Sequence, residues 1–126
     1  MSLRFQAVCV DAVEPGPVAD FWQAVLGWRR TFDDGREIVL EPPAGSAEDG
    51  VAPDLVFLEV PEPKTLKNRL HIDLLPDDQA AEVARLEGLG ARRVSVGQGE
   101  DVSWVVLADT EGNELCVLQA RRPDET

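Results

Sequence analysis

An internal repeat constrains this chain more than any other feature, because similar halves predict two folding units of one architecture. Each half contains a Leu-Gly pair that is followed closely by an Arg-Arg pair. Leu26-Gly27 and Arg29-Arg30 recur as Leu89-Gly90 and Arg92-Arg93, an offset of 63 positions in a chain of 126 residues. The order of predicted elements also repeats, which is stronger evidence than the dipeptides. We therefore expect one domain made of two modules, 1–62 and 67–121.

The first module has the pattern strand, helix and three strands. The helix begins near Pro17, because proline suits a first helical turn, and Gly27 ends it. The Asp34-Gly35 pair predicts a hairpin turn. The expected strands cover residues 5–11, 28–33, 38–40 and 55–60.

The second module repeats this order. Pro76-Asp77-Asp78 starts a helix whose acidic first turn suits the helix dipole, and Gly90 ends it. The expected strands cover residues 70–75, 93–96, 102–108 and 115–118. The chain is therefore predicted to be an α+β protein of two βαβββ modules. Their free sheet faces would curve toward each other to form a cleft, the usual place for a small-molecule site.

Composition excludes several classes of function. The chain has 24 acidic and 12 basic side chains and a net charge of −12, so it lacks the cationic footprint of a nucleic-acid-binding protein. No apolar run reaches the roughly 18 residues that a membrane-spanning helix needs. Two cysteines are too few for a disulfide scaffold, so we expect free thiols and a cytoplasmic location.

Three segments carry a resemblance to a known family. They are Ala19–Trp22 with the following Leu26-Gly27-Trp28, the stretch Lys67–Leu74, and the final turn and strand Asp109–Val117, in which Thr110 stands where proline is usual. With this repeat, the chain resembles the vicinal oxygen chelate superfamily of glyoxalase I, bleomycin-resistance proteins and extradiol dioxygenases, and within it the glyoxalase-like domain proteins. The resemblance implies the same α+β fold but not the reaction, since one fold hosts many functions.

The resemblance also implies four positions for the ligands of a divalent metal, which enzymes of the superfamily fill with His, Glu or Gln. His71, the single histidine, matches one position and Cys116 matches another. The remaining two fall near Ala7 and near Phe57 or Leu58, which are apolar. Because a catalytic zinc site normally has three protein ligands, we expect no metal and no other cofactor.

A shift of one residue would offer Gln6 and Glu59 instead, although it would turn them to the opposite face of the sheet. The alternative is therefore a metal-dependent lyase, isomerase or dioxygenase. In it His71, with Glu59 or Gln6, would hold Zn, Ni, Mn or Fe, and the metal would polarise substrate oxygens.

Four residues of the second module are the candidate site. His71 and Asp73 lie two apart on one predicted strand, so they share a face and form either a ligand-binding or acid–base pair or a structural hydrogen bond. Trp104 is a candidate aromatic wall, against a role in core packing. Cys116 lines the same face, and its thiol is either a nucleophile or a small buried hydrophobe. Cys9, in the predicted core strand 5–11, has the same two alternatives.

We thus predict a protein that binds a small organic ligand, with His71, Asp73, Trp104 and Cys116 around it and with His71 as the candidate catalytic residue. Besides the metal enzyme, a cofactor-free enzyme with His71 as general base stays open. Neither nucleic acid nor a membrane is expected as a partner. Because superfamily members often dimerise, a homodimer is one state open to the chain, with Trp28 near the sheet rim.

Overall fold

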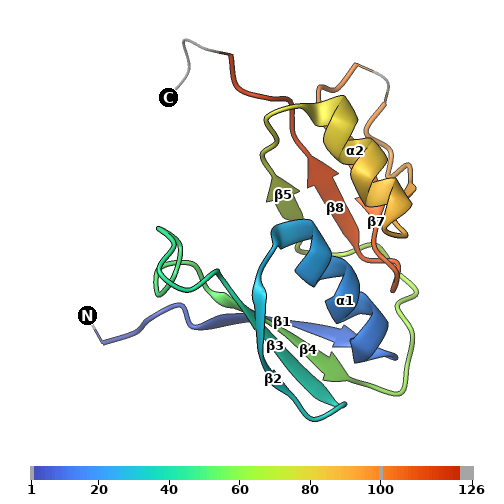
Figure 1. Cartoon of the computed structure of the whole chain (residues 1–126). Helices are drawn as coiled ribbons and strands as arrows, with labels where there is room; N and C mark the ends of the chain where they lie inside the picture. The colour runs from blue at the N-terminus through green and yellow to red at the C-terminus, as the bar shows by residue number, and fades with distance from the viewer. Residues whose placement is uncertain (1, 100, 123–126) are drawn as a thin grey trace. The chain divides into compact units, whose positions relative to one another are not determined.

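The computed structural model describes residues 2–99 and 101–122, which fall into two compact units (Figure 1). The first unit ends at Pro63 and the second begins at Lys64. Each unit contains one helix and one four-stranded sheet. The predicted pair of βαβββ modules is therefore confirmed.

The first unit comprises β1 (Ala7–Ala12), α1 (Pro15–Leu26), β2 (Arg29–Asp33), β3 (Glu37–Glu41) and β4 (Asp54–Glu59). The sheet order is β1-β4-β3-β2. β1 pairs with β4 in parallel, and the other two pairings are antiparallel. The first and last strands of the unit are thus neighbours in the sheet.

Helix α1 covers the sheet with one apolar stripe. Val18, Phe21, Trp22 and Val25 are buried, and the helix contacts β1, β3 and β4. Gly27 ends the helix as predicted: its φ of 67° is left-handed, and its N–H donates to the Gln23 carbonyl at 2.8 Å. The helix begins at Pro15 rather than at Pro17, because both prolines are tolerated in the first turn, where backbone N–H groups have no helical acceptor.

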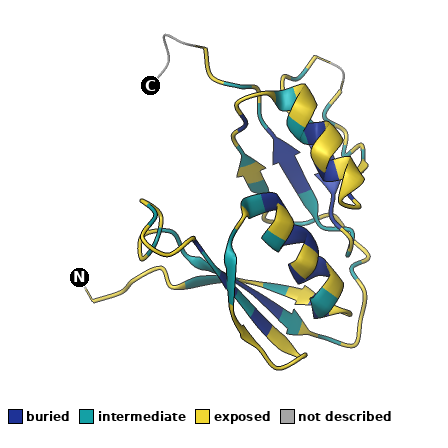
Figure 2. Ribbon diagram, viewed as in Figure 1, coloured by how far each residue is buried: buried dark blue, intermediate teal, exposed yellow. Residues whose placement is uncertain are grey.

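The second unit comprises β5 (Ile72–Leu74), α2 (Gln79–Gly88), β6 (Arg92–Arg93), β7 (Val105–Ala108) and β8 (Glu114–Val117). Its sheet has the order β5-β8-β7-β6, with β5 parallel to β8 and the other pairs antiparallel. β7 and β8 form the buried centre of the sheet, whereas most of α2 faces outward (Figure 2). Asp78 caps α2 by accepting a hydrogen bond from the Ala81 N–H at 3.1 Å.

A buried carboxylate organises the turn between β7 and β8. Asp109 is 2% exposed, and its Oδ1 accepts from the N–H groups of Glu111 and Asn113, each at 2.9 Å. Its Oδ2 accepts from the Asn113 side-chain amide at 3.3 Å. Gly112 has a positive φ in this turn and Asn113 does not, so Asn113 serves the turn through hydrogen bonds.

Several predicted elements differ from those observed. The strands predicted at 70–75 and 102–108 are shorter, as β5 and β7, and the strand predicted at 93–96 is the two-residue β6, which begins one residue earlier. Cys9 was expected in a core strand and does lie on β1, but its side chain is exposed. Among the described residues, neither helix is long and apolar enough to cross a membrane.

Candidate functional site

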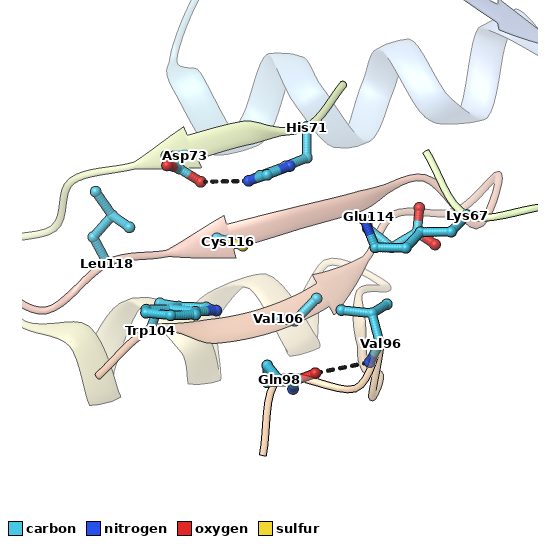
Figure 3. Close-up of a pocket in the computed structure, with 10 residues that line it drawn as sticks. All are labelled: Lys67, His71, Asp73, Val96, Gln98, Trp104, Val106, Glu114, Cys116 and Leu118. Atoms are coloured by element: carbon cyan, nitrogen blue, oxygen red, sulfur yellow. Dashed lines mark hydrogen bonds and ion pairs between the residues drawn. The ribbon is translucent and has the colours of Figure 1, made fainter. Parts of the chain in front are cut away.

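The sheet of the second unit carries a cavity of about 310 Å³ (Figure 3). This volume is at the lower end of the range typical of small-molecule sites. Its floor is the pair Val106 and Cys116, which face each other across β7 and β8. The lining residues all belong to the second unit: Lys67, His71, Asp73, Val96, Gln98, Trp104, Val106, Glu114, Cys116 and Leu118.

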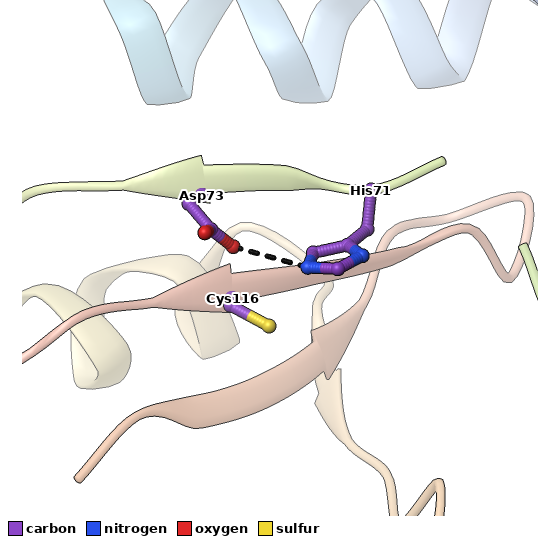
Figure 4. Close-up of side chains that lie close together, drawn as sticks. All are labelled: His71, Asp73 and Cys116. Atoms are coloured by element: carbon purple, nitrogen blue, oxygen red, sulfur yellow. Dashed lines mark ion pairs between the residues drawn. The ribbon is translucent and has the colours of Figure 1, made fainter. Parts of the chain in front are cut away.

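Strand register brings three polar side chains together in this cavity. Asp73 on β5 lies directly opposite Cys116 on β8, and His71 precedes Asp73 by two residues, so its side chain projects from the same face. Nε2 of His71 is 3.3 Å from Oδ1 of Asp73 (Figure 4). The nitrogen, oxygen and sulfur atoms that the three residues offer all lie within 4.8 Å of one another. We call these three residues the polar cluster.

The environment of Cys116 does not activate its thiol. Burial raises the pKa of Cys116, and the charge of Asp73 and a hydrogen bond with it raise the pKa further. The positive charge of Lys67 opposes this shift without reversing it. Because the thiolate is the reactive form, the arrangement does not favour a nucleophilic cysteine.

An aromatic and aliphatic wall closes one end of the cavity. Val105 pairs with Val117, which places Trp104 and Leu118 next to each other at the ends of β7 and β8 (Figure 3). Trp104 is 40% exposed, so its ring is a surface that a ligand can cover rather than part of the core. Gln79 of α2 supports this end, since its side-chain amide donates to the carbonyl groups of Ser103 at 2.7 Å and Val117 at 3.1 Å.

Charged residues lie at the other end. Oε1 of Glu114 contacts Nζ of Lys64 at 3.1 Å, and its Oε2 accepts from the Asn68 N–H at 3.0 Å. Burial favours the protonated acid, but these hydrogen bonds outweigh it and lower the pKa of Glu114. The segment that leads into β5 is thereby tied to the start of β8. The side chain of Lys67, in the same segment, lines the cavity.

The first unit keeps apart the two metal ligands that the one-residue shift would offer. Glu59 pairs with Ala12, at the far end of β1 from Gln6, so their backbones are roughly 20 Å apart. Gln6 instead donates to Asp54 at 3.3 Å, and Glu59 contacts Arg36. Gln6 and Glu59 therefore cannot bind one ion together, and a metal held by His71 with only one of them stays a prediction.

The unshifted positions of the first unit do not offer metal ligands either. Ala7 is apolar and pairs with Asp54, and Phe57 is fully buried in the core. The residues present therefore do not fit a metal held jointly by four positions of the two modules. His71 and Cys116 do lie together, with Asp73 as a third donor that the superfamily positions had not included.

All four candidate residues of the second module line the same cavity, although their roles in binding or catalysis stay predictions. The sequence interpretation missed the other lining residues. For Glu114 and Leu118 a signal existed, because they lie two residues on either side of Cys116 and so share its face. For Val96 and Gln98, which approach from a loop, no such signal was available.

The chain matches the family model of the glyoxalase-like domain over residues 7–118. No curated protein matches it. Among solved structures, the antibiotic-binding protein TnmS3 from Streptomyces sp. CB03234 is 21% identical, with a TM-score of 0.63 and coverage of 96% of this chain and 99% of that one.

Two other solved structures, both of complexes with ligands, share the fold. A bleomycin-binding protein from Streptomyces verticillus, in complex with copper(II)-bleomycin, is 14% identical, with a TM-score of 0.60 and coverage of 96% and 99% of the two chains. The fosfomycin resistance protein FosX from Listeria monocytogenes, in complex with Mn(II) and sulfate, is 9% identical, with a TM-score of 0.69 and coverage of 96% and 92%. Since the family model spans most of its length, the chain belongs to the glyoxalase-like domain family, within the vicinal oxygen chelate superfamily.

Proposed function

We propose that this protein binds a small organic ligand with an aromatic or apolar body and a polar end, in the cavity of the second unit. The observation that carries the proposal is the division of one cavity into an apolar end and a polar cluster. The ligand body would cover the exposed ring of Trp104. The polar end would meet His71 and Asp73.

The chemistry of the lining supports this assignment. Small-molecule sites combine apolar walls with a few polar groups that fix the orientation of the ligand. Trp104, Leu118 and Val106 supply the walls, and Asp73 offers an acceptor for a hydroxyl or amine of the ligand. Lys67 offers a positive charge at the opposite end from Trp104. Two structural neighbours are antibiotic-binding proteins, so aromatic antibiotics are the first class of ligand to test.

The test is a binding titration with anilinonaphthalene sulfonate, followed by its displacement with a panel of aromatic antibiotics. Covering an indole ring contributes on the order of 1.5 kcal/mol, so Trp104→Ala should weaken binding about tenfold. Phe32→Ala is the matched control, because Phe32 is a similarly exposed aromatic residue (48%) on β2 of the first unit. Equal affinity of the Trp104 variant and the unchanged protein would refute the proposal.

A second function is favoured by the contact between Nε2 of His71 and Oδ1 of Asp73. In this arrangement a carboxylate orients an imidazole, which can then act as a general base toward a bound substrate. His71 would be the catalytic residue of a cofactor-free enzyme. Turnover of any ligand found in the panel, followed by its loss in His71→Gln with binding retained, tests this candidate.

A further inference from the structure

The polar cluster contains three different metal-ligating groups on a single sheet. His71 offers an imidazole nitrogen, Asp73 a carboxylate oxygen and Cys116 a sulfur. The backbone places them without help from the first unit, because β5 and β8 are paired and Asp73 lies opposite Cys116. All three also line the cavity.

The spacing of these groups suits a small tetrahedral ion. Zinc binds nitrogen and oxygen at about 2.0–2.1 Å and sulfur at about 2.3 Å, so its ligand atoms lie roughly 3.3–3.6 Å apart. The separation of 3.3 Å between His71 and Asp73 already falls in this range. No pair exceeds 4.8 Å, and the side chains of His71 and Asp73 are about half exposed, which leaves them free to adjust.

The type of donor atoms narrows the choice of ion. Calcium and magnesium select oxygen ligands, whereas a set of one thiolate, one imidazole and one carboxylate suits zinc. Three protein ligands are the number found in zinc sites that keep one position open. Here the open position would face the cavity, because each of the three ligands lines it.

We propose that His71, Asp73 and Cys116 form a zinc site that the second unit builds alone, with its fourth position open to the cavity. Asp73 takes the place of the ligands that the first module lacks. The proposal departs from the expectation of a metal-free cavity because that expectation counted only two donors. It does not rest on the proposed ligand binding, since the three donors are independent of the wall formed by Trp104.

The experiment uses the full-length, untagged protein, because a histidine tag would itself bind the metal. After chelation and dialysis, the protein is titrated with Zn²⁺ in competition with a chromophoric chelator, and in parallel with Co²⁺. We expect one equivalent of metal per chain and, with Co²⁺, the charge-transfer absorption of a metal-bound thiolate.

Near-isosteric variants assign the ligands. Cys116→Ser should abolish the charge-transfer band, and Asp73→Asn should lower zinc affinity by more than about tenfold, since even loss of an outer-shell partner commonly costs that much. Cys9→Ser is the matched control, because Cys9 is the other free thiol and lies on β1 of the first unit. It should retain both the band and the affinity.

Three results would overturn the proposal: no thiolate band in the unchanged protein, a band that survives in Cys116→Ser, or unchanged zinc affinity in Asp73→Asn. Circular dichroism verifies that each variant is folded. Trp104→Ala separates this proposal from ligand binding, because it should weaken binding of the organic ligand while leaving zinc stoichiometry at one.

Discussion

Replacing Asp109 with alanine should destabilise the second unit. The buried carboxylate accepts from the backbone N–H groups of Glu111 and Asn113 and from the Asn113 side chain. Hydrogen bonds to a charged group contribute about 1.5–3 kcal/mol each. Because Glu111 and Asn113 are only partly buried, water can replace some of what is lost. We therefore expect the free energy of unfolding to fall by about 3 kcal/mol.

The assay is urea denaturation followed by circular dichroism, from which the free energy of unfolding is extrapolated. For a unit of this size the same loss corresponds to a decrease in melting temperature of roughly 15 °C. Asp109→Asn keeps one acceptor oxygen and should lose less. Asp101→Ala, at an exposed acidic residue of the same unit, serves as the control and should change stability by less than about 0.5 kcal/mol. A loss below about 1 kcal/mol in Asp109→Ala, or an equal loss in the control, would show that the carboxylate does not organise the turn.

Three further predictions concern the cavity and its supports. Cys9 should react with iodoacetamide well before Cys116, because Cys9 is exposed and Cys116 is buried. Asp73→Asn should speed the reaction of Cys116 at a given pH by removing the charge that raises the pKa of its thiol, and mass spectrometry of the labelled peptides measures both rates. The pKa of Glu114 is lower in the folded protein, so its contribution to stability is present above the unfolded pKa and is lost as the pH falls through the folded pKa. Glu114→Gln should therefore flatten the acid side of the plot of unfolding free energy against pH, and an unchanged plot would contradict the role given to Glu114. Gln79→Ala should weaken ligand binding although Gln79 does not line the cavity, because the substitution removes the hydrogen bond that holds the Ser103 carbonyl beside Trp104. Unchanged affinity for anilinonaphthalene sulfonate would show that Gln79 does not position Trp104.

Much of the fold could be predicted because local signals agreed with the repeat. Gly27 ends α1 with a left-handed φ, and Asp34 accepts hydrogen bonds from the N–H groups of Arg36 and Glu37 in the predicted turn. Strand lengths in the second unit could not be predicted, because a strand extends only where a partner pairs with it. Leu70, in the strand predicted at 70–75, is 85% exposed and precedes β5.

The face of Cys9 was mispredicted for a related reason. The run Ala7–Val10 is apolar without interruption, so it has no period of two that would assign a side chain to one face. The shared face of His71 and Asp73 could be predicted, because residues two apart on a strand project from the same face of the sheet. Their proximity to Cys116 followed only from the resemblance and not from residue spacing, since it depends on the parallel register of β5 and β8, which joins residues 43 positions apart.

The most direct test of the central claim is to map ligand binding on the protein by nuclear magnetic resonance. A ¹⁵N-labelled sample is titrated with anilinonaphthalene sulfonate while the amide signals and the indole Nε1–H of Trp104 are followed. The account predicts that the largest shifts fall on Trp104 and on the strand residues Asp73, Val106 and Cys116. Shifts confined to the first unit, or to the outward face of α2, would contradict it.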